Sequence, residues 1–183
     1  MDLALVSEIL GWTSIAFYIS ITVFNSMKIT RFAAFGSTGN DIIWSLLMGW
    51  YPKLILNLSV TGVNAYRYAK DFTKAPLALL NTLVALMFAG IGYIFWFAVT
   101  NFLKDPTLST GMQFADLGVI LLALSMKDLK HYRILMLISG FVGMVGYYGN
   151  TQMMIIKAMV IGIMCFKLFI EKEKKENLEE KTA

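Results

Sequence analysis

The stretch GSTGNDIIWSLLMGWYPKLILNLSVTGVNAYRY, residues 36–68, decides the fold because its two apolar segments carry polar groups at membrane depth. It predicts two membrane-spanning helices joined by a tight turn at 49–52. Asp41 lies ten residues after Arg31 and nine before Trp50. At about 1.5 Å per residue this places it near the middle of a ~30 Å apolar slab. An ionised carboxylate there costs about 2.5–3.5 kcal/mol, so it needs a partner, water or a proton.

A polar stripe runs along the second of these segments. Its members are spaced four, four, three and four residues apart, which puts them on one helical face: Lys53, Asn57, Thr61, Asn64 and Tyr68. Because a polar stripe that faced lipid would be costly, we expect it to face protein or a water-filled path.

The composition is that of a membrane protein. The chain has 183 residues, of which 57% are hydrophobic and 15% charged, and its mean hydropathy is +0.64. In a membrane protein, the basic residues behind the net charge of +4 are expected to set the orientation of the chain in the bilayer. We therefore expect no nucleic-acid partner. With one histidine and one cysteine, most catalytic designs and Cys-based metal sites are disfavoured. We therefore expect neither an enzyme nor a bound cofactor or metal.

The apolar runs predict an all-α fold of seven membrane-spanning helices in a single transmembrane domain, 1–171. The expected spans are 5–25, 32–50, 53–70, 76–102, 108–126, 132–148 and 151–171, followed by a charged cytoplasmic tail at 172–183. Lys28 and Arg31 fall in the loop before the second span. With the N-terminus outside, thirteen of the sixteen Lys and Arg residues lie at the inner ends of the spans. This bias favours an N-out, C-in topology.

The two halves of the chain share turn and charge positions. Gly49 and Gly149 both precede a span, and Gly62 and Gly162 both lie within one, at the same offset of one hundred. Ser26-Met27-Lys28 recurs as Ser125-Met126-Lys127. A three-span unit repeated in the same orientation needs an odd span between its copies. We therefore predict bundles at 5–70 and 108–171, linked by the span 76–102.

The three-plus-one-plus-three layout resembles the SWEET, PQ-loop and PnuC superfamily of small-solute carriers. The turn Gly49-Trp50-Tyr51-Pro52, followed by Ile55-Leu56-Asn57, is similar to that of the bacterial inner-membrane YgjV family. Two features depart from the wider superfamily, because no Pro-Gln pair and no clear aromatic motif of the vitamin carriers is present. The resemblance implies the fold more than the substrate, and it implies a multi-pass protein of the bacterial inner membrane.

Asp41 and Asp116 are the sharpest candidates for a functional site, one in each repeat. Asp116 lies about halfway along its span, and burial in hydrocarbon favours the protonated form of either carboxyl. One hypothesis is a proton relay or a counter-ion for a cationic solute. The alternative is a hydrogen-bonded carboxyl that locks helices together.

Further polar and aromatic residues complete the candidate solute site, or else act as glue between helices. Amides recognise hydroxyls and carbonyls, and a tryptophan offers a flat face to a ring or a cation. The residues are Asn40, Trp44, Asn57, Thr61, Asn64 and Gln113.

Other residues have simpler interpretations. We expect Lys157 to snorkel to the outer membrane surface, with pairing to Asp116 or Asp41 as the alternative. Gly140, Gly143 and Gly146 predict a close-packing seam. We expect interfacial anchors at three tryptophans, and a solvated histidine in a basic loop: Trp12, Trp50, Trp96 and His131.

These patterns predict a carrier of a small polar or cationic metabolite, working by alternating access between the two bundles and open to proton coupling. Two alternatives stay open, a non-transporting membrane receptor of the same fold and an ion channel. The sequence leaves the substrate undetermined, and it leaves a homo-oligomer open.

The predicted topology can be tested with reporters fused after Ala183. Because the C-terminal tail is expected in the cytoplasm, a fluorescent-protein fusion should be bright and an alkaline phosphatase fusion should be inactive. An active phosphatase would mean that a span has been miscounted, and it would contradict the parallel repeat as well.

Overall fold

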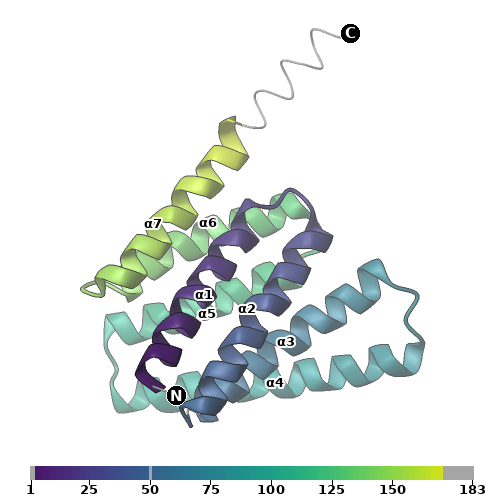
Figure 1. Cartoon of the computed structure of the whole chain (residues 1–183), viewed down its shortest axis with the longest axis horizontal. Coiled ribbons are helices and arrows are strands. Elements are labelled where there is room, and N and C mark those ends of the chain that lie inside the picture. Colours follow the sequence, from purple (N-terminus) through teal and green to yellow (C-terminus); the bar gives the residue numbers. More distant parts are fainter. Residues whose placement is uncertain (1–2, 50, 171–183) are drawn as a thin grey trace, which may run out of the picture. The chain divides into compact units, whose positions relative to one another are not determined.

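The computed structural model describes residues 3–49 and 51–170, and all regular structure within these ranges is helical. The elements are α1 (Leu3–Val23), α2 (Met27–Leu47), α3 (Tyr51–Phe72), α4 (Leu77–Lys104), α5 (Leu108–Ser125), α6 (Leu129–Gly146), α7 (Thr151–Cys165) and the π-helical η1 (Phe166–Ile170), which continues α7 (Figure 1). The all-helical class and its seven α-helices are confirmed for the described residues. The predicted tail and Trp50 lie outside them.

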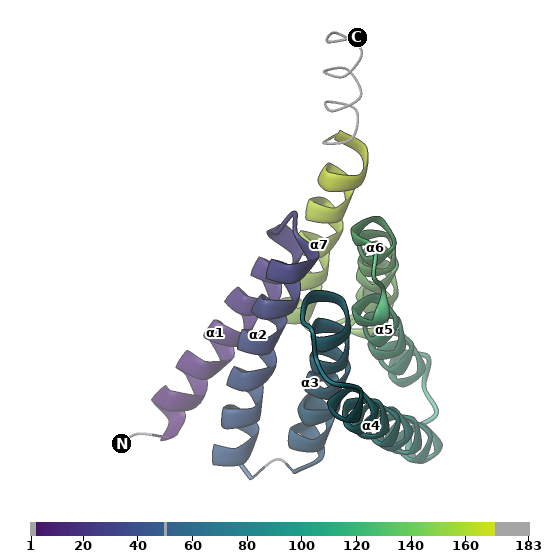
Figure 2. The ribbon, with the colours of Figure 1, turned by 90° about the vertical axis from the view of Figure 1, so that its right-hand side faces the viewer.

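The chain divides into two compact units, unit 1 (Met1–Pro106) and unit 2 (Thr107–Ala183). In unit 1, α2 packs against both α1 and α3, and α4 packs against α3, so that the helices follow one another in chain order (Figure 2). In unit 2, α6 packs against both α5 and α7. The middle helix of each set of three therefore contacts both of its neighbours, and the predicted linker helix, α4, groups with unit 1.

The start of α2 differs from the sequence prediction. The helix begins at Met27 because Ser26 is extended and nothing in the following residues breaks a helix. Arg31 therefore lies on the helix, with only 1% of its surface exposed, and its predicted place in a loop is wrong. Asp41 lies about 9 Å from the end of α2 rather than midway along it. Asp116, by contrast, lies midway along α5 as predicted.

Gly49 and Gly149 both adopt a left-handed backbone conformation, with φ of 66° and 89°. No other described residue has a positive φ. Each glycine stands two residues before the first residue of a helix, α3 in unit 1 and α7 in unit 2. A side chain with a Cβ would be strained at either position, so the same backbone requirement is met one hundred residues apart.

Ten buried positions of unit 1 coincide with buried positions of unit 2. In the first helices they are Ser14, Ile21 and Thr22 of α1, matched 102 residues later by Asp116, Ala123 and Leu124 of α5. In the second helices the same offset relates Thr30, Ala34, Ser37 and Thr38 of α2 to Tyr132, Met136, Ser139 and Gly140 of α6. In the third helices an offset of 100 relates Asn57, Val60 and Asn64 of α3 to Lys157, Val160 and Met164 of α7.

This register replaces one of the predicted sequence matches. Met27 and Lys28 begin α2, whereas Met126 and Lys127 precede α6, so the Ser-Met-Lys match is not structurally equivalent. The residues that share helix positions are Lys28 with Lys130 and Arg31 with Arg133, at the second and fifth positions of α2 and α6. The α1–α2 and α5–α6 connections are both three residues long, so the offset of 102 continues through them and the Ser-Met-Lys match at 99 is out of register.

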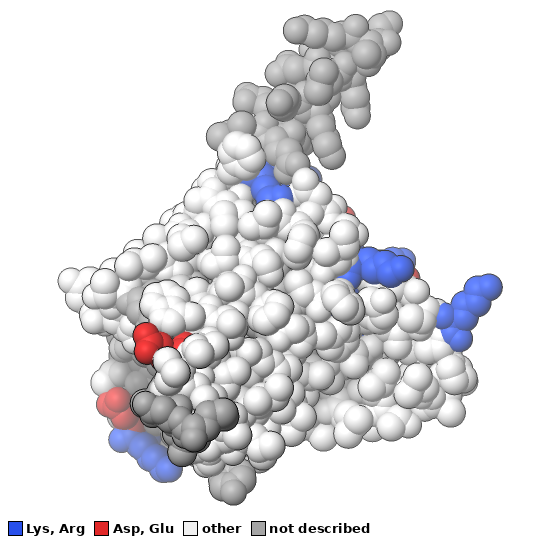
Figure 3. Space-filling model, viewed as in Figure 1, with Lys and Arg blue, Asp and Glu red and all other residues white. Residues whose placement is uncertain are grey.

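Among the described residues, two helices, α4 and α5, are long and apolar enough to cross a membrane, and Glu8–Val23 of α1 is a shorter apolar stretch. Of the residues of α4 only Gly90 and Ile94 are buried, and large apolar side chains such as Phe88 and Phe95 are exposed. In the view of Figure 3, charged side chains occupy a few separate places and most of the described surface is uncharged. Exposed apolar side chains such as those of α4 are typical of contact with lipid or with protein.

The predicted glycine seam of α6 is confirmed. A Cβ on Gly140 would lie 2.5 Å from Ile161, and one on Gly143 would lie 2.5 Å from the Lys157 side chain, both on α7. A Cβ on Gly146 would lie 2.8 Å from the backbone nitrogen of Gln113 on α5. The three glycines thus let α6 approach both of its neighbours closely.

We predict that Gly146→Ala lowers the stability of the protein by about 1–3 kcal/mol, because the added methyl meets backbone atoms of α5 that side-chain rotation cannot move. Gly118→Ala on α5 is the matched control. A Cβ there has open space, so stability should be unchanged or raised by up to ~1 kcal/mol. Thermal unfolding of both variants in detergent provides the comparison, and equal effects would contradict the close approach.

Candidate functional site

A buried ion pair joins α5 to α7 in unit 2. Lys157 Nζ lies 2.6 Å from Asp116 Oδ2, and each side chain is only 2% exposed. The expectation that Lys157 snorkels is therefore wrong, and its pairing with Asp116 is confirmed. The lysine stem lies against Gly143, where any larger residue would displace it. The carboxylate of Asp116 and the space beside Gly143 together allow Lys157 to be buried within unit 2.

Ser139 of α6 completes this cluster, which we call the unit 2 triad (Asp116, Ser139 and Lys157). Ser139 Oγ donates to Asp116 Oδ1 at 2.5 Å, and Lys157 Nζ donates to Ser139 Oγ at 3.3 Å. Lys157 Nζ also lies 5.9 Å from the centre of the Tyr147 ring. Both carboxylate oxygens of Asp116 thus have a partner from the same unit. This geometry favours the helix-locking interpretation of Asp116 over a counter-ion for a solute.

In unit 1, Asn40 and Asp41 attach α2 to α1. Asp41 Oδ1 accepts a hydrogen bond of 2.7 Å from Ser14 Oγ. Asn40 Nδ2 donates to Ser14 Oγ at 2.6 Å and to the carbonyl oxygen of Leu10 at 2.7 Å, while Asn40 Oδ1 accepts from Thr13 Oγ1 at 3.1 Å. Asn40 and Asp41 are consecutive residues of α2, and both are half-buried. Both bond to the hydroxyl of Ser14.

Trp44 lies one turn further along α2. Its indole ring passes 3.5 Å from the place that a Cβ on Gly11 of α1 would occupy. The ring therefore covers the backbone of α1 where the glycine leaves space for it. Trp44 therefore contacts α1, the same helix to which Asn40 and Asp41 bond.

The polar stripe of α3 faces the protein, as predicted, at its two asparagines. Asn57 is 6% exposed and Asn64 is fully buried. Arg31 Nη1 of α2 donates to Asn64 Oδ1 at 3.4 Å. The side-chain nitrogens of Asn57 and Asn64 are buried, and among the described residues neither has a hydrogen-bond acceptor. We call Arg31, Asn57 and Asn64 the unit 1 donor cluster.

The remaining members of the stripe make local or packing contacts. Thr61 Oγ1 donates to the carbonyl oxygen of Asn57 at 2.8 Å, within the helix. The Tyr68 ring packs edge-on against Phe35 at 5.9 Å between centroids. The side chain of Lys53 lies outside the described part of the structure.

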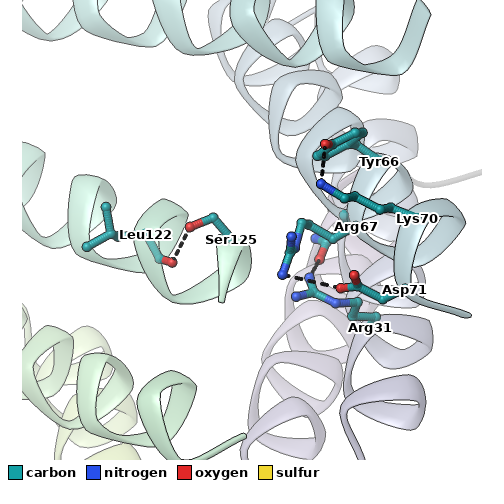
Figure 4. Close-up of polar contacts among 8 residues, drawn as sticks. Arg31, Tyr66, Arg67, Lys70, Asp71, Leu122 and Ser125 are labelled. Atoms are coloured by element: carbon teal, nitrogen blue, oxygen red, sulfur yellow. Dashed lines mark hydrogen bonds and ion pairs between the residues drawn. The ribbon is translucent and has the colours of Figure 1, made fainter. Parts of the chain in front are cut away.

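The end of α3 adds further charge beside this cluster. Arg67 forms an ion pair with Asp71 at 3.3 Å, and Lys70 Nζ donates to the Tyr66 hydroxyl at 3.1 Å. Figure 4 shows the guanidinium of Arg31 beside the Arg67–Asp71 pair. With two arginines and one aspartate, this end of unit 1 carries a net positive charge.

Gln113 has a structural role in unit 2. Its Nε2 donates to the carbonyl oxygen of Gly146 at 2.8 Å and to Ser109 Oγ at 3.2 Å, and Ser109 Oγ donates to the same carbonyl at 2.7 Å. The last residue of α6 would otherwise lack an intrahelical partner for this oxygen. Gln113 therefore ties α5 to the end of α6.

An apolar groove of about 450 Å³ lies in unit 1, apart from the polar clusters. Its lining residues belong to α1, to α2 and to the loop between them: Phe17, Ser20, Phe24, Ile29, Phe32, Ala33, Phe35 and Gly36. None of the predicted site residues lines it.

At the start of α6, Asp128 caps the helix and accepts from the backbone amide of His131 at 3.2 Å. This backbone hydrogen bond lowers the pKa of the Asp128 carboxyl below its ordinary value. The His131 ring nitrogen lies 2.7 Å from the same carboxylate, and its side chain is 68% exposed. The prediction of a solvated histidine is thus confirmed. Trp12 and Trp96 are also exposed, as interfacial anchors require.

Sequence reasoning missed Ser14, Arg31 and Ser139. Arg31 stood in a basic run that also fits a loop, although its spacing from Lys28 is that of a helix. The two serines carried no signal, because a serine in an apolar segment usually bonds to its own helix. Ser14 matches Asp116, and Ser139 matches Ser37, but these matches can be recognised only after the buried positions of the two units are aligned.

Comparison of the chain with models of protein families, with curated proteins and with solved structures finds no match. Among the described residues, no group of three His, Cys, Asp or Glu side chains is placed to hold a metal ion. The function is therefore inferred from the geometry of the two polar clusters.

The unit 2 triad leads to a stability prediction. Lys157→Met and Asp116→Leu should each destabilise the protein by about 3–5 kcal/mol, because each leaves a buried charge without its partner. The double variant should be much less destabilised than the sum of the two, since no unpaired charge remains. Thermal unfolding of the four proteins measures this coupling, and additive effects would show that the pair is not energetically linked.

Proposed function

We propose that this protein is a multi-pass carrier for a small polar solute in a bacterial inner membrane, built from seven spans in a three-plus-one-plus-three order. The observation that carries the proposal is the common interior of the two units, in which ten buried positions coincide. Parallel repeats separated by an odd helix are one of the architectures of secondary transporters. Here α1–α3 and α5–α7 are the repeats, and α4 is the helix between them.

The charge pattern supports the orientation of this proposal. Lys28 and Arg31 stand at the start of α2, and Lys130 and Arg133 stand at the same positions of α6. Two repeats in the same orientation put these four residues on the same side of the membrane, as the positive-inside rule requires for an N-out, C-in topology. The apolar surface of α4 supports membrane insertion. The resemblance to the YgjV family agrees with this reading.

The proposed solute site lies in unit 1. In unit 2 the polar interior satisfies itself through Asp116, Ser139 and Lys157, which leaves little for a solute to bind. In unit 1 the buried amides of Asn57 and Asn64 retain free donors. Asp41, which is half-buried and accepts from Ser14, is the better candidate for a coupling proton or cation.

Cysteine accessibility tests whether the site is open from both sides. In a Cys165→Ser background, Asn64→Cys should react with a membrane-impermeant maleimide both in right-side-out cells and in inverted vesicles, because alternating access exposes a carrier site to each side in turn. Phe88→Cys on the apolar surface of α4 is the control that should resist labelling in both. Reaction from one side only would favour the receptor alternative over the carrier.

A further inference from the structure

The two units differ at one set of matched positions. In unit 2, Lys157, the seventh residue of α7, donates to the carboxylate of Asp116 on α5. The equivalent residues of unit 1 are Asn57, the seventh residue of α3, and Ser14 of α1. All four side chains are buried. The donor on the third helix is thus Lys157 in unit 2 and Asn57 in unit 1. The residue at the matched position of the first helix is Asp116 in unit 2 and Ser14 in unit 1.

In unit 1 the matching acceptor is missing. Ser14 is too short to replace an aspartate, and its hydroxyl donates to Asp41 on the neighbouring helix. The side-chain nitrogen of Asn57 is left buried with no acceptor among the described residues. A buried N–H group without an acceptor is costly, so a structure that retains one usually has a ligand or water to satisfy it.

Asn64 repeats this arrangement two turns along α3. Its oxygen accepts from Arg31, which directs the amide nitrogen away from the guanidinium and leaves that nitrogen without an acceptor. Arg31 is itself almost fully buried and brings a permanent positive charge to the site. The unit 1 donor cluster therefore offers amide donors and a cation, which together suit an anionic acceptor.

We propose that the unit 1 donor cluster binds a carboxylate group of the solute, which takes the place in unit 1 that the Asp116 side chain has in unit 2. The inference rests on the proposed carrier function and narrows its solute to a small organic acid. Asn57 donates to this carboxylate through its side-chain nitrogen. Asn64, about 10 Å further along α3, donates to a second acceptor of the same solute, such as the other carboxylate of a dicarboxylic acid, beside the positive charge of Arg31. Asp41, on the α1 side of α2, is left for any basic group that the same solute carries.

Thermal shift and calorimetry of the full-length protein in detergent test the ligand class. The probes are acetate and succinate as carboxylates, glycine as a zwitterion, methylamine as a cation and glycerol as a neutral polyol. Succinate or glycine should raise the unfolding temperature, because a ligand that binds only the folded protein stabilises it. Methylamine and glycerol should not. A response to methylamine or glycerol alone, or to none of the probes, would overturn the assignment.

Variants then locate the binding. Asn57→Asp, which replaces the donor with an acceptor of the same shape, should weaken succinate binding by about 10- to 100-fold, the loss expected for a hydrogen bond to a charged group. Asn57→Leu should abolish the shift while leaving the ligand-free unfolding temperature unchanged or higher, since it removes an unsatisfied donor. If Asn57 instead holds helices together, Asn57→Leu will lower that temperature and leave binding intact.

Asn101→Asp provides the matched control. Asn101 is a partly buried asparagine of α4 whose nitrogen already donates to the carbonyl oxygen of Phe97, so its substitution should not change the affinity for succinate. The two proposals fail separately. Succinate binding with one-sided labelling at position 64 would refute the carrier and keep the acid site, whereas two-sided labelling without any carboxylate response would refute the acid site and keep the carrier.

Discussion

Asp116 and Lys157 are buried together in unit 2, and each requires the other because an unpaired charge in an apolar interior is strongly destabilising. Their contact constrains the packing around them. Ser139 must present its hydroxyl between the two charged groups, and Gly143 must have no side chain, so that the lysine stem passes along α6. The close approach of α6 to α7 follows from this pair, and Gln113 and Gly146 extend the same tight packing to α5.

Unit 1 meets the same physical constraint in another way. Its matched positions hold neutral side chains, and the nearby carboxylate, Asp41, comes from α2 and bonds to Ser14. The hydroxyl of Ser14 therefore donates to Asp41. The side-chain nitrogen of Asn57 is left without a hydrogen-bond acceptor among the described residues. A repeat that closes its own polar network becomes a rigid support, while a repeat that leaves donors unsatisfied has something to offer a ligand. This difference between the two units is the basis for our proposal of a solute site in unit 1.

The helical class and the approximate positions of the seven α-helices were predictable from the sequence, because apolar runs and turn residues act locally. The turns at Gly49 and Gly149 are an example, since a left-handed residue before a helix favours glycine whatever surrounds it. The start of α2 was not predictable in the same way. Lys28 and Arg31 suggested a loop, but the helix includes both, and burial of Arg31 against Asn64 is a contact between two helices.

The sequence by itself determined the helical class, the turn positions and the candidate polar residues, because periodicity and composition encode which face of a helix is polar. Tertiary structure decided which polar residues have partners. Asp116 lies on α5 and Lys157 on α7, with α6 between them in the chain, so their pairing depends on how α5 and α7 pack around α6. The same holds for Asn57, whose unsatisfied donor can be recognised only when all of its neighbours are in place.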